Sequence, residues 1–266
     1  MHAVASLALT LVALAGAGFV AGVLGALLGI GGGVFLVPVL TVFLDVPIRA
    51  AVGASLVGVI ATSAGVAWLA TGKRGADVGL AMRLELATTS GAILGSLLAG
   101  WMSPVALHFL FAAIVFFLAG YTLYRAHRRA GEGSEEDLFR TDYIPRHWFV
   151  GMGFSLVAGA LSGLLGVGGG FIKVPVMYGI MGIPLGVATA TSNFMVGITA
   201  SASFFIYYGR GDIHPALAVP TALGVFAGAL TGARLAPRLR AAWLRTALIL
   251  LLVFIGVQML WKGLSL

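Results

Sequence analysis

The sequence predicts an all-α polytopic membrane protein with about 8–10 membrane segments, arranged as two homologous, inverted repeats. Hydrophobic residues make up 60% of the chain and charged residues only 9%, and the mean hydropathy is +1.05. Because a soluble domain carries about 25% charged residues, we expect the lipid bilayer to be the surrounding medium. In addition, the stretch GIGGGVFLVP at residues 29–38 returns almost unchanged as GVGGGFIKVP at residues 166–175.

The repeat extends beyond this glycine motif. When residues 20–55 are placed over residues 157–192, 16 of the 36 positions are identical. Further along, the pattern G-x-x-x-G at residues 91–95 matches the same pattern at 224–228. We therefore divide the chain into transmembrane repeat 1 (residues 1–125), a polar and basic cytoplasmic linker (126–147) and transmembrane repeat 2 (148–266).

Each repeat is expected to contain the same elements in the same order. A long apolar helix leads into the glycine motif, at about 4–28 and 148–165. A short apolar segment follows, at about 34–44 and 171–182, and a proline-containing turn comes after it. Three further helices complete each repeat, at about 50–71, 79–101 and 104–125, and at about 186–208, 215–234 and 241–262. The first helix lacks a basic start and is longer than the apolar core of a signal peptide, so we expect it to be retained.

The basic residues indicate how the chain is oriented. The formal net charge is +7, but the Lys and Arg residues lie between apolar runs, as the positive-inside rule predicts. Nucleic acid is therefore not an expected partner. If each repeat crosses the membrane five times and the linker is in the cytoplasm, then 12 of the 16 basic residues are cytoplasmic. They are Lys73, Arg74, Arg83, Arg125, Arg128, Arg129, Arg140, Arg146, Arg234, Arg238, Arg240 and Arg245. Four passes per repeat would place fewer there, so we expect inverted repeats in the cell inner (cytoplasmic) membrane.

The glycine motifs are the candidate substrate site. Consecutive glycines are poor helix formers, and irregular backbone at membrane depth must be covered by protein or reached by water. We expect each motif to break a helix near mid-membrane, so that free N–H groups and helix dipoles face an anion between the repeats. The residues concerned are Gly31, Gly32, Gly33, Gly168, Gly169 and Gly170. The alternative is that these glycines serve only close helix packing.

Four side chains complete the candidate site. Lys173 replaces Leu36 of the first copy and would add a positive charge beside the glycine break. Its alternative role is to snorkel to the membrane surface. Ser55, Ser192 and Asn193 could donate hydrogen bonds to an oxyanion, or could cap a helix or bond to a neighbouring one.

Other kinds of chemistry find little support in the sequence. We expect the nine carboxylates in or near loops, with Glu85 and Arg83 at a shared membrane interface, so no mid-membrane cation site is expected. The chain has no cysteine, and its glycine motifs lack the spacing of dinucleotide-binding and phosphate-binding loops. We therefore expect no catalytic residues, no metal and no cofactor, and we assign no oligomeric state.

The duplicated motif resembles that of the TauE/SafE family of bacterial sulfite and organosulfonate exporters. The resemblance rests on GIGGGVFLVP with Pro47 and Ser55, and on GVGGGFIKVP with Pro184 and the run ATATSN to Asn193. It covers nearly the whole chain, and it implies a secondary transporter that exports sulfite, thiosulfate or an organosulfonate. The alternatives are an importer, a carrier of another small anion, or a non-transporting membrane subunit. An inside-negative potential favours anion efflux, so we expect export without a coupled ion.

Overall fold

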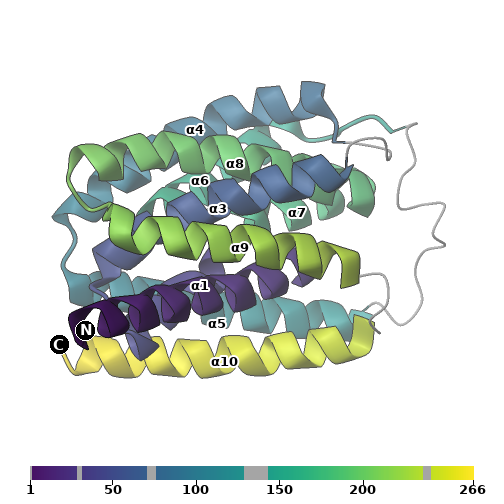
Figure 1. Cartoon of the computed structure of the whole chain (residues 1–266). Helices are drawn as coiled ribbons and strands as arrows, with labels where there is room; N and C mark the ends of the chain where they lie inside the picture. The colour runs from purple at the N-terminus through teal and green to yellow at the C-terminus, as the bar shows by residue number, and fades with distance from the viewer. Residues whose placement is uncertain (1, 29–31, 71–75, 129–142, 236–240) are drawn as a thin grey trace.

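The computed structural model describes residues 2–28, 32–70, 76–128, 143–235 and 241–266, and all secondary structure within them is helical (Figure 1). The helices of the first half are α1 (His2–Leu28), α2 (Gly33–Pro38), η1 (Val39–Phe43), α3 (Ile48–Ala70), α4 (Val78–Trp101) and α5 (Pro104–Arg128). Those of the second half are α6 (Trp148–Leu165), α7 (Gly170–Gly179), α8 (Leu185–Gly209), α9 (Pro215–Leu235) and α10 (Ala241–Leu264). The predicted all-α fold is confirmed.

Five of these helices are both long and apolar enough to cross a membrane. The spans are Leu9–Leu27, Ile48–Gly65, Pro104–Tyr124, Trp148–Leu165 and Pro215–Leu235. Helices α4, α8 and α10 lie alongside them and contain 24, 25 and 24 residues. At 1.5 Å per residue, each is about 36 Å long, which is enough for a bilayer core of about 30 Å. The protein is therefore a multi-pass membrane protein.

The helices end at two opposite faces of the molecule, and contacts between their ends define these faces. At the linker end, the Asp77 N–H donates to Thr191 Oγ1 (3.0 Å) and the Tyr143 hydroxyl donates to Asp77 Oδ2 (2.6 Å). At the terminal end, Arg49 Nη2 donates to the Met102 carbonyl (2.8 Å). Helix α1 begins and α10 ends at this second face (Figure 1). The first half thus runs from the terminal end to the linker end, and the second half returns.

The two halves interleave rather than forming separate bundles. Helix α1 packs against α9 and α6 against α4, while α3 contacts α8 and α5 contacts α10. Glycines bring the first two pairs into backbone contact: a Cβ on Gly22 would lie 2.2 Å from the Val225 carbonyl oxygen, and one on Gly95 would lie 2.0 Å from that of Ala160. Each close pair joins one helix from either half. A twofold relation between the halves would produce this exchange, and that relation stays a prediction.

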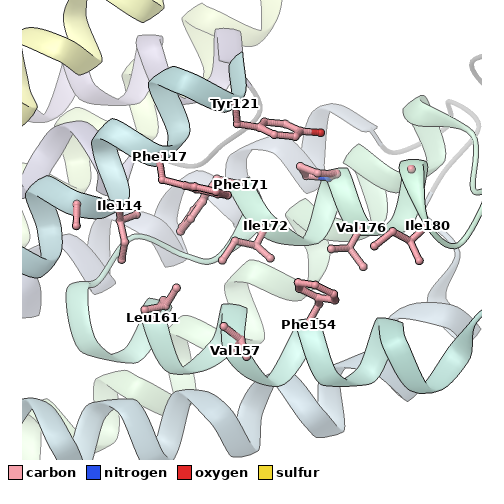
Figure 2. Close-up of a pocket in the computed structure, with 13 residues that line it drawn as sticks. Ile114, Phe117, Tyr121, Phe154, Val157, Leu161, Phe171, Ile172, Val176 and Ile180 are labelled. Carbon is pink, nitrogen blue, oxygen red and sulfur yellow. The ribbon is translucent and has the colours of Figure 1, made fainter. Parts of the chain in front are cut away.

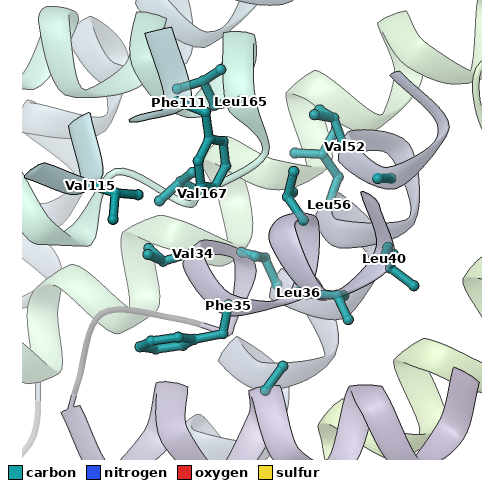
Figure 3. Close-up of a cluster of buried hydrophobic side chains, with 14 of the residues drawn as sticks. Val34, Phe35, Leu36, Leu40, Val52, Leu56, Phe111, Val115, Leu165 and Val167 are labelled. Atoms are coloured by element: carbon teal, nitrogen blue, oxygen red, sulfur yellow. The ribbon is translucent and has the colours of Figure 1, made fainter. Parts of the chain in front are cut away.

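The short helix α2 lies in the apolar centre of the molecule. Figure 3 shows Val34, Phe35 and Leu36 of this helix among side chains from α3, α5 and the segment after α6. All six residues of α2 are buried, and Leu36 is completely inaccessible. The first half therefore places only apolar side chains at the position where the second half carries Lys173.

Helix α5, predicted to end at about residue 125, continues through Arg128, and the division into two repeats joined by a linker at 126–147 stays a prediction. Residues 129–142 lie outside the described part of the chain, and helix α6 begins at Trp148 as predicted.

Candidate functional site

The second glycine motif separates α6 from α7. Helix α6 ends at Leu165, and α7 begins at Gly170. Between them, Gly166, Gly168 and Gly169 have φ angles of 67°, 89° and 67°, in the left-handed region that side chains disfavour. The backbone course of this turn therefore depends on glycine at these three positions.

The first motif contacts the second. Residues 29–31, including the candidate Gly31, lie outside the described residues; Gly32 caps α2 and Gly33 is its first residue. A Cβ on Gly33 would lie 2.3 Å from the Gly166 carbonyl oxygen. The Ser55 hydroxyl donates a hydrogen bond to the same oxygen (2.8 Å). The structure thus brings Gly33 and Ser55 of the first half to the start of the second break.

Lys173 is buried, with 2% of its surface exposed, so its snorkelling role is wrong. It lies in the second turn of α7, where helical side chains lean back toward the N-terminus and hence toward the glycine break. Its Nζ atom donates to Thr199 Oγ1 of α8 (3.3 Å) and lies 4.0 Å from Glu85 Oε2 of α4. The Thr199 hydroxyl donates in turn to Glu85 Oε1 (2.6 Å). We call Lys173, Thr199 and Glu85 the buried charge cluster.

The predicted interface position of Glu85 beside Arg83 is also wrong. Glu85 is 5% exposed, whereas Arg83 is exposed and its guanidinium lies 5.4 Å from the Trp148 ring centroid. Residues two apart on a helix are separated by about 200° around its axis, so the two side chains must face opposite directions. The expectation of no carboxylate inside the membrane is therefore wrong, because Glu85 is buried there.

Helices α4 and α8 are parallel and stay in register along their length, which fixes the depth of the cluster. Three contacts join residues 114 positions apart: Asp77 to Thr191, Glu85 to Thr199, and the Ser96 carbonyl to Arg210. Glu85 is eight residues from Asp77 and eleven from Ser96, about 12 and 16 Å along the helix. The cluster is thus near the middle of a bilayer core of about 30 Å.

Several buried hydroxyl groups line the same region. Within the described part of the chain, Ser162, Ser192 and Ser203 have inaccessible hydroxyl oxygens without a hydrogen-bond partner. Ser192 and Ser203 lie on the same face of α8 as Thr199, at seven and four residues from it. Ser162 of α6 lies beside Gly169, at the start of α7. Asn193 is half-buried, and its backbone carbonyl oxygen accepts a hydrogen bond from the Ser63 hydroxyl (2.7 Å).

An apolar cavity of about 620 Å³ lies between α5, α6 and α7 (Figure 2). Ile172 and Val176 of α7 line it, together with Phe117 of α5 and Phe154 of α6, whereas Lys173 points toward α8. A wall of this kind offers no compensation for the lost hydration of an anion. The cavity is therefore separate from the candidate anion site and lies behind α7.

Comparison with known proteins identifies the family. The family model described as Sulfite exporter TauE/SafE matches residues 14–259. The chain belongs to the TauE/SafE family. The resemblance seen in the sequence is thereby confirmed, and the protein is a membrane transporter rather than an enzyme. Sequence reasoning did not assign Glu85 or Thr199 to the site. Glu85 could have been found, because it is the one acidic residue of its apolar segment and Lys173 is the one basic residue of another.

Individual relatives agree with this assignment. The chain is 24% identical over 261 residues to Probable membrane transporter protein YunE of Bacillus subtilis (strain 168), covering 92% of this chain and 96% of the relative. It is likewise 24% identical over 243 residues to Probable membrane transporter protein YdhB of the same organism, covering 91% and 97%. Sulfite exporter TauE/SafE family protein 1 of Arabidopsis thaliana is 36% identical over 99 residues, covering 37% of this chain and 22% of that protein. No solved structure matches the chain.

Proposed function

We propose that this protein exports a small sulfur-containing anion, such as sulfite, thiosulfate or an organosulfonate, across the cytoplasmic membrane. The observation that carries the proposal is the buried ammonium group of Lys173, next to a glycine break at the centre of a transporter whose family is described as sulfite exporters. An intramembrane ionisable residue of this kind is costly, and such residues mark substrate pathways.

The anion would bind at the start of α7. The first N–H groups of a helix have no partner within it, so the backbone of Gly168, Gly169 and Gly170 would donate to anionic oxygens at the positive end of the helix dipole. Lys173 would supply the charge. Ser192, whose hydroxyl is buried without a partner among the described residues, would add a hydrogen bond.

The remaining sequence candidates take other parts in the proposal. Ser55 and Gly33 already contact the Gly166 carbonyl, so we assign them to shaping the second break. Gly31, Gly32 and Asn193 stay candidate ligands for an anion that reaches between the two motifs.

The membrane potential would drive export. With the cytoplasm negative, each net negative charge that moves outward gains about 2.3 kcal/mol per 100 mV. Reversal of the potential should therefore slow the efflux of a dianion.

Flux measurements in proteoliposomes test this proposal. Vesicles are loaded in parallel with sulfite, thiosulfate, sulfoacetate, acetate or chloride, and efflux is followed while a potassium gradient sets the potential. We expect one or more sulfur anions to leave faster than from empty vesicles, and faster with an inside-negative potential. Selective efflux of acetate or chloride would instead indicate a carrier of another anion. Equal leakage of all five from protein-containing and empty vesicles would contradict transport of these anions.

The role of Lys173 is tested in a background without its buried partner. In Glu85→Gln, the further change Lys173→Gln removes the positive charge without leaving an unpaired carboxylate. Charged hydrogen bonds contribute about 1.5–3 kcal/mol, so we expect the transport KM to rise about 10- to 100-fold relative to Glu85→Gln alone. The matched control is Lys262→Gln, at a partly exposed lysine paired with Asp45. An unchanged KM in the double variant would remove Lys173 from the binding site.

A further inference from the structure

The buried charge cluster is balanced in the structure before any anion arrives. Glu85 and Lys173 carry opposite charges, are 5% and 2% exposed, and are joined through the Thr199 hydroxyl. Glu85 Oε1 also accepts from the Thr89 hydroxyl (3.1 Å), while Oε2 has no hydrogen-bond partner in the described chain and lies 4.0 Å from Lys173 Nζ. The carboxylate thus occupies the side of Lys173 where an anion would compete for the ammonium group.

Lys173 is the only basic side chain on α6, α7 and α8, the described helices that pack around Glu85. Helix α6 contains no ionisable residue, and α8 contains only Tyr207 and Tyr208, close to the terminal end. Helix α7 adds Tyr178, and a tyrosine side chain cannot become a cation. On α4 itself, Arg83 lies on the opposite face and Asp77 is bound to Leu80 and Tyr143 at the linker end. Glu85 therefore depends on Lys173 for charge compensation.

Binding of an anion to Lys173 would leave Glu85 as an uncompensated charge at the centre of the membrane. Breaking a buried ion pair by removing one partner is strongly unfavourable, and a buried carboxylate avoids that cost by taking up a proton. The neutral acid can keep both threonine contacts, because both hydroxyls donate to Oε1, which stays an acceptor with two lone pairs when the proton is on Oε2.

We propose that Glu85 is the proton-coupling residue of the transporter: it pairs with Lys173 when the site is empty and takes one proton from the adjoining water when an anion replaces it. In this step, hydronium becomes water and the carboxylate becomes a carboxylic acid, with no change of oxidation state. When the anion leaves, the proton leaves with it and the ion pair forms again. A monoanion then moves without net charge, and a dianion moves with one negative charge. The inference rests on the proposed function, because it uses the same anion and the same lysine.

Thiosulfate and sulfoacetate are suitable probes because both are fully ionised near neutral pH and carry no proton of their own. Anion flux and internal pH, reported by a trapped pH-sensitive dye, are measured in the same vesicles. We expect about one proton to move with each anion in the unaltered protein and none in Glu85→Gln. Because the proton no longer accompanies the anion, the charge moved per dianion should rise from about one to about two. Asp45→Asn, which removes an exposed carboxylate paired with Lys262, should keep the original ratio.

The outcomes separate the two proposals. Absence of sulfur-anion flux in the unaltered protein contradicts the proposed function, whereas flux without proton movement contradicts only the role of Glu85. A proton ratio that is the same in Glu85→Gln as in the unaltered protein also overturns that role. If Glu85→Gln fails to fold, Thr199→Val provides the second variant: it removes a hydrogen bond to the carboxylate without changing charge. This variant should shift the pH at which anion flux is half-maximal, and an unshifted profile would count against the inference.

Discussion

Replacement of Lys173 by methionine should destabilise the protein more than the same change at Lys262. Methionine keeps a long apolar side chain of similar reach but leaves the Glu85 carboxylate, 5% exposed, without a counter-ion. Removing one member of a buried ion pair costs about 3–5 kcal/mol, which lowers the folding equilibrium constant by about two to three and a half orders of magnitude. The double variant Glu85→Gln/Lys173→Met removes both charges, and we expect it to regain most of this loss.

The assay is SDS-induced unfolding in mixed micelles. Thiol-reactive reporters are unsuitable because the chain has no cysteine, but its five tryptophans provide an intrinsic fluorescence signal. Lys262→Met is the control, because exposed ion pairs contribute only about 0.2–1 kcal/mol. Unfolding of Lys173→Met at the same SDS fraction as Lys262→Met would contradict a requirement of Glu85 for its counter-ion. A double variant less stable than Lys173→Met alone would contradict it as well.

Three further predictions concern the backbone and the linker end. Gly33→Ala should reduce the yield of monodisperse protein on size-exclusion chromatography, because its Cβ would lie 2.3 Å from a carbonyl oxygen of the second motif; an unaltered yield would contradict the contact. Gly159→Ala would place a Cβ 1.9 Å from the backbone of α4 and should destabilise the protein by about 1–3 kcal/mol in the SDS assay. Gly153→Ala, which meets nothing within 4 Å, should be near neutral, and equal effects of the two would refute the packing argument. Tyr143→Phe should speed hydrogen exchange in the segment before α6, because it loses the bond to Asp77. Burial raises the pKa of the Tyr143 phenol, and both the hydrogen bond to Asp77 and the charge of Asp77 raise it further. The stabilisation by this hydrogen bond should therefore persist through neutral pH and weaken only above pH 10. Equal hydrogen exchange in Tyr143→Phe and the unaltered protein would contradict this prediction.

Helix positions could be predicted from the sequence because long uncharged runs and glycine–proline turns leave few alternatives. The predicted start of α6 at residue 148 and its end at 165 agree with the structure. The environment of Lys173 could not be predicted, since hydropathy gives no depth for a ten-residue helix whose direction depends on a glycine turn. Glu85 was misplaced for a related reason: Arg83, two residues away, suggested a surface, whereas the two side chains leave α4 on opposite sides.

The glycines illustrate a second limit. Close helix packing and a break in the backbone both occur among the glycines of this chain, at different positions. Gly22 and Gly95 lie against the backbone of a neighbouring helix, whereas Gly166, Gly168 and Gly169 adopt left-handed conformations between helices. Sequence spacing alone does not separate these uses, because the φ angle and the neighbouring backbone decide between them.

The interleaved pairs α1–α9 and α4–α6 restrict how this protein can move. A hinge that swings one half of the chain away from the other, as the repeats suggest, would have to separate both pairs, whose backbones touch at glycine. The parts that stay rigid during transport should therefore each contain helices from both halves. The mobile part is then expected to be small: α7 has an apolar cavity behind it and the charge cluster in front. A cross-link between α1 and α9 should leave transport intact, whereas one that fixes α7 to α5 should stop it.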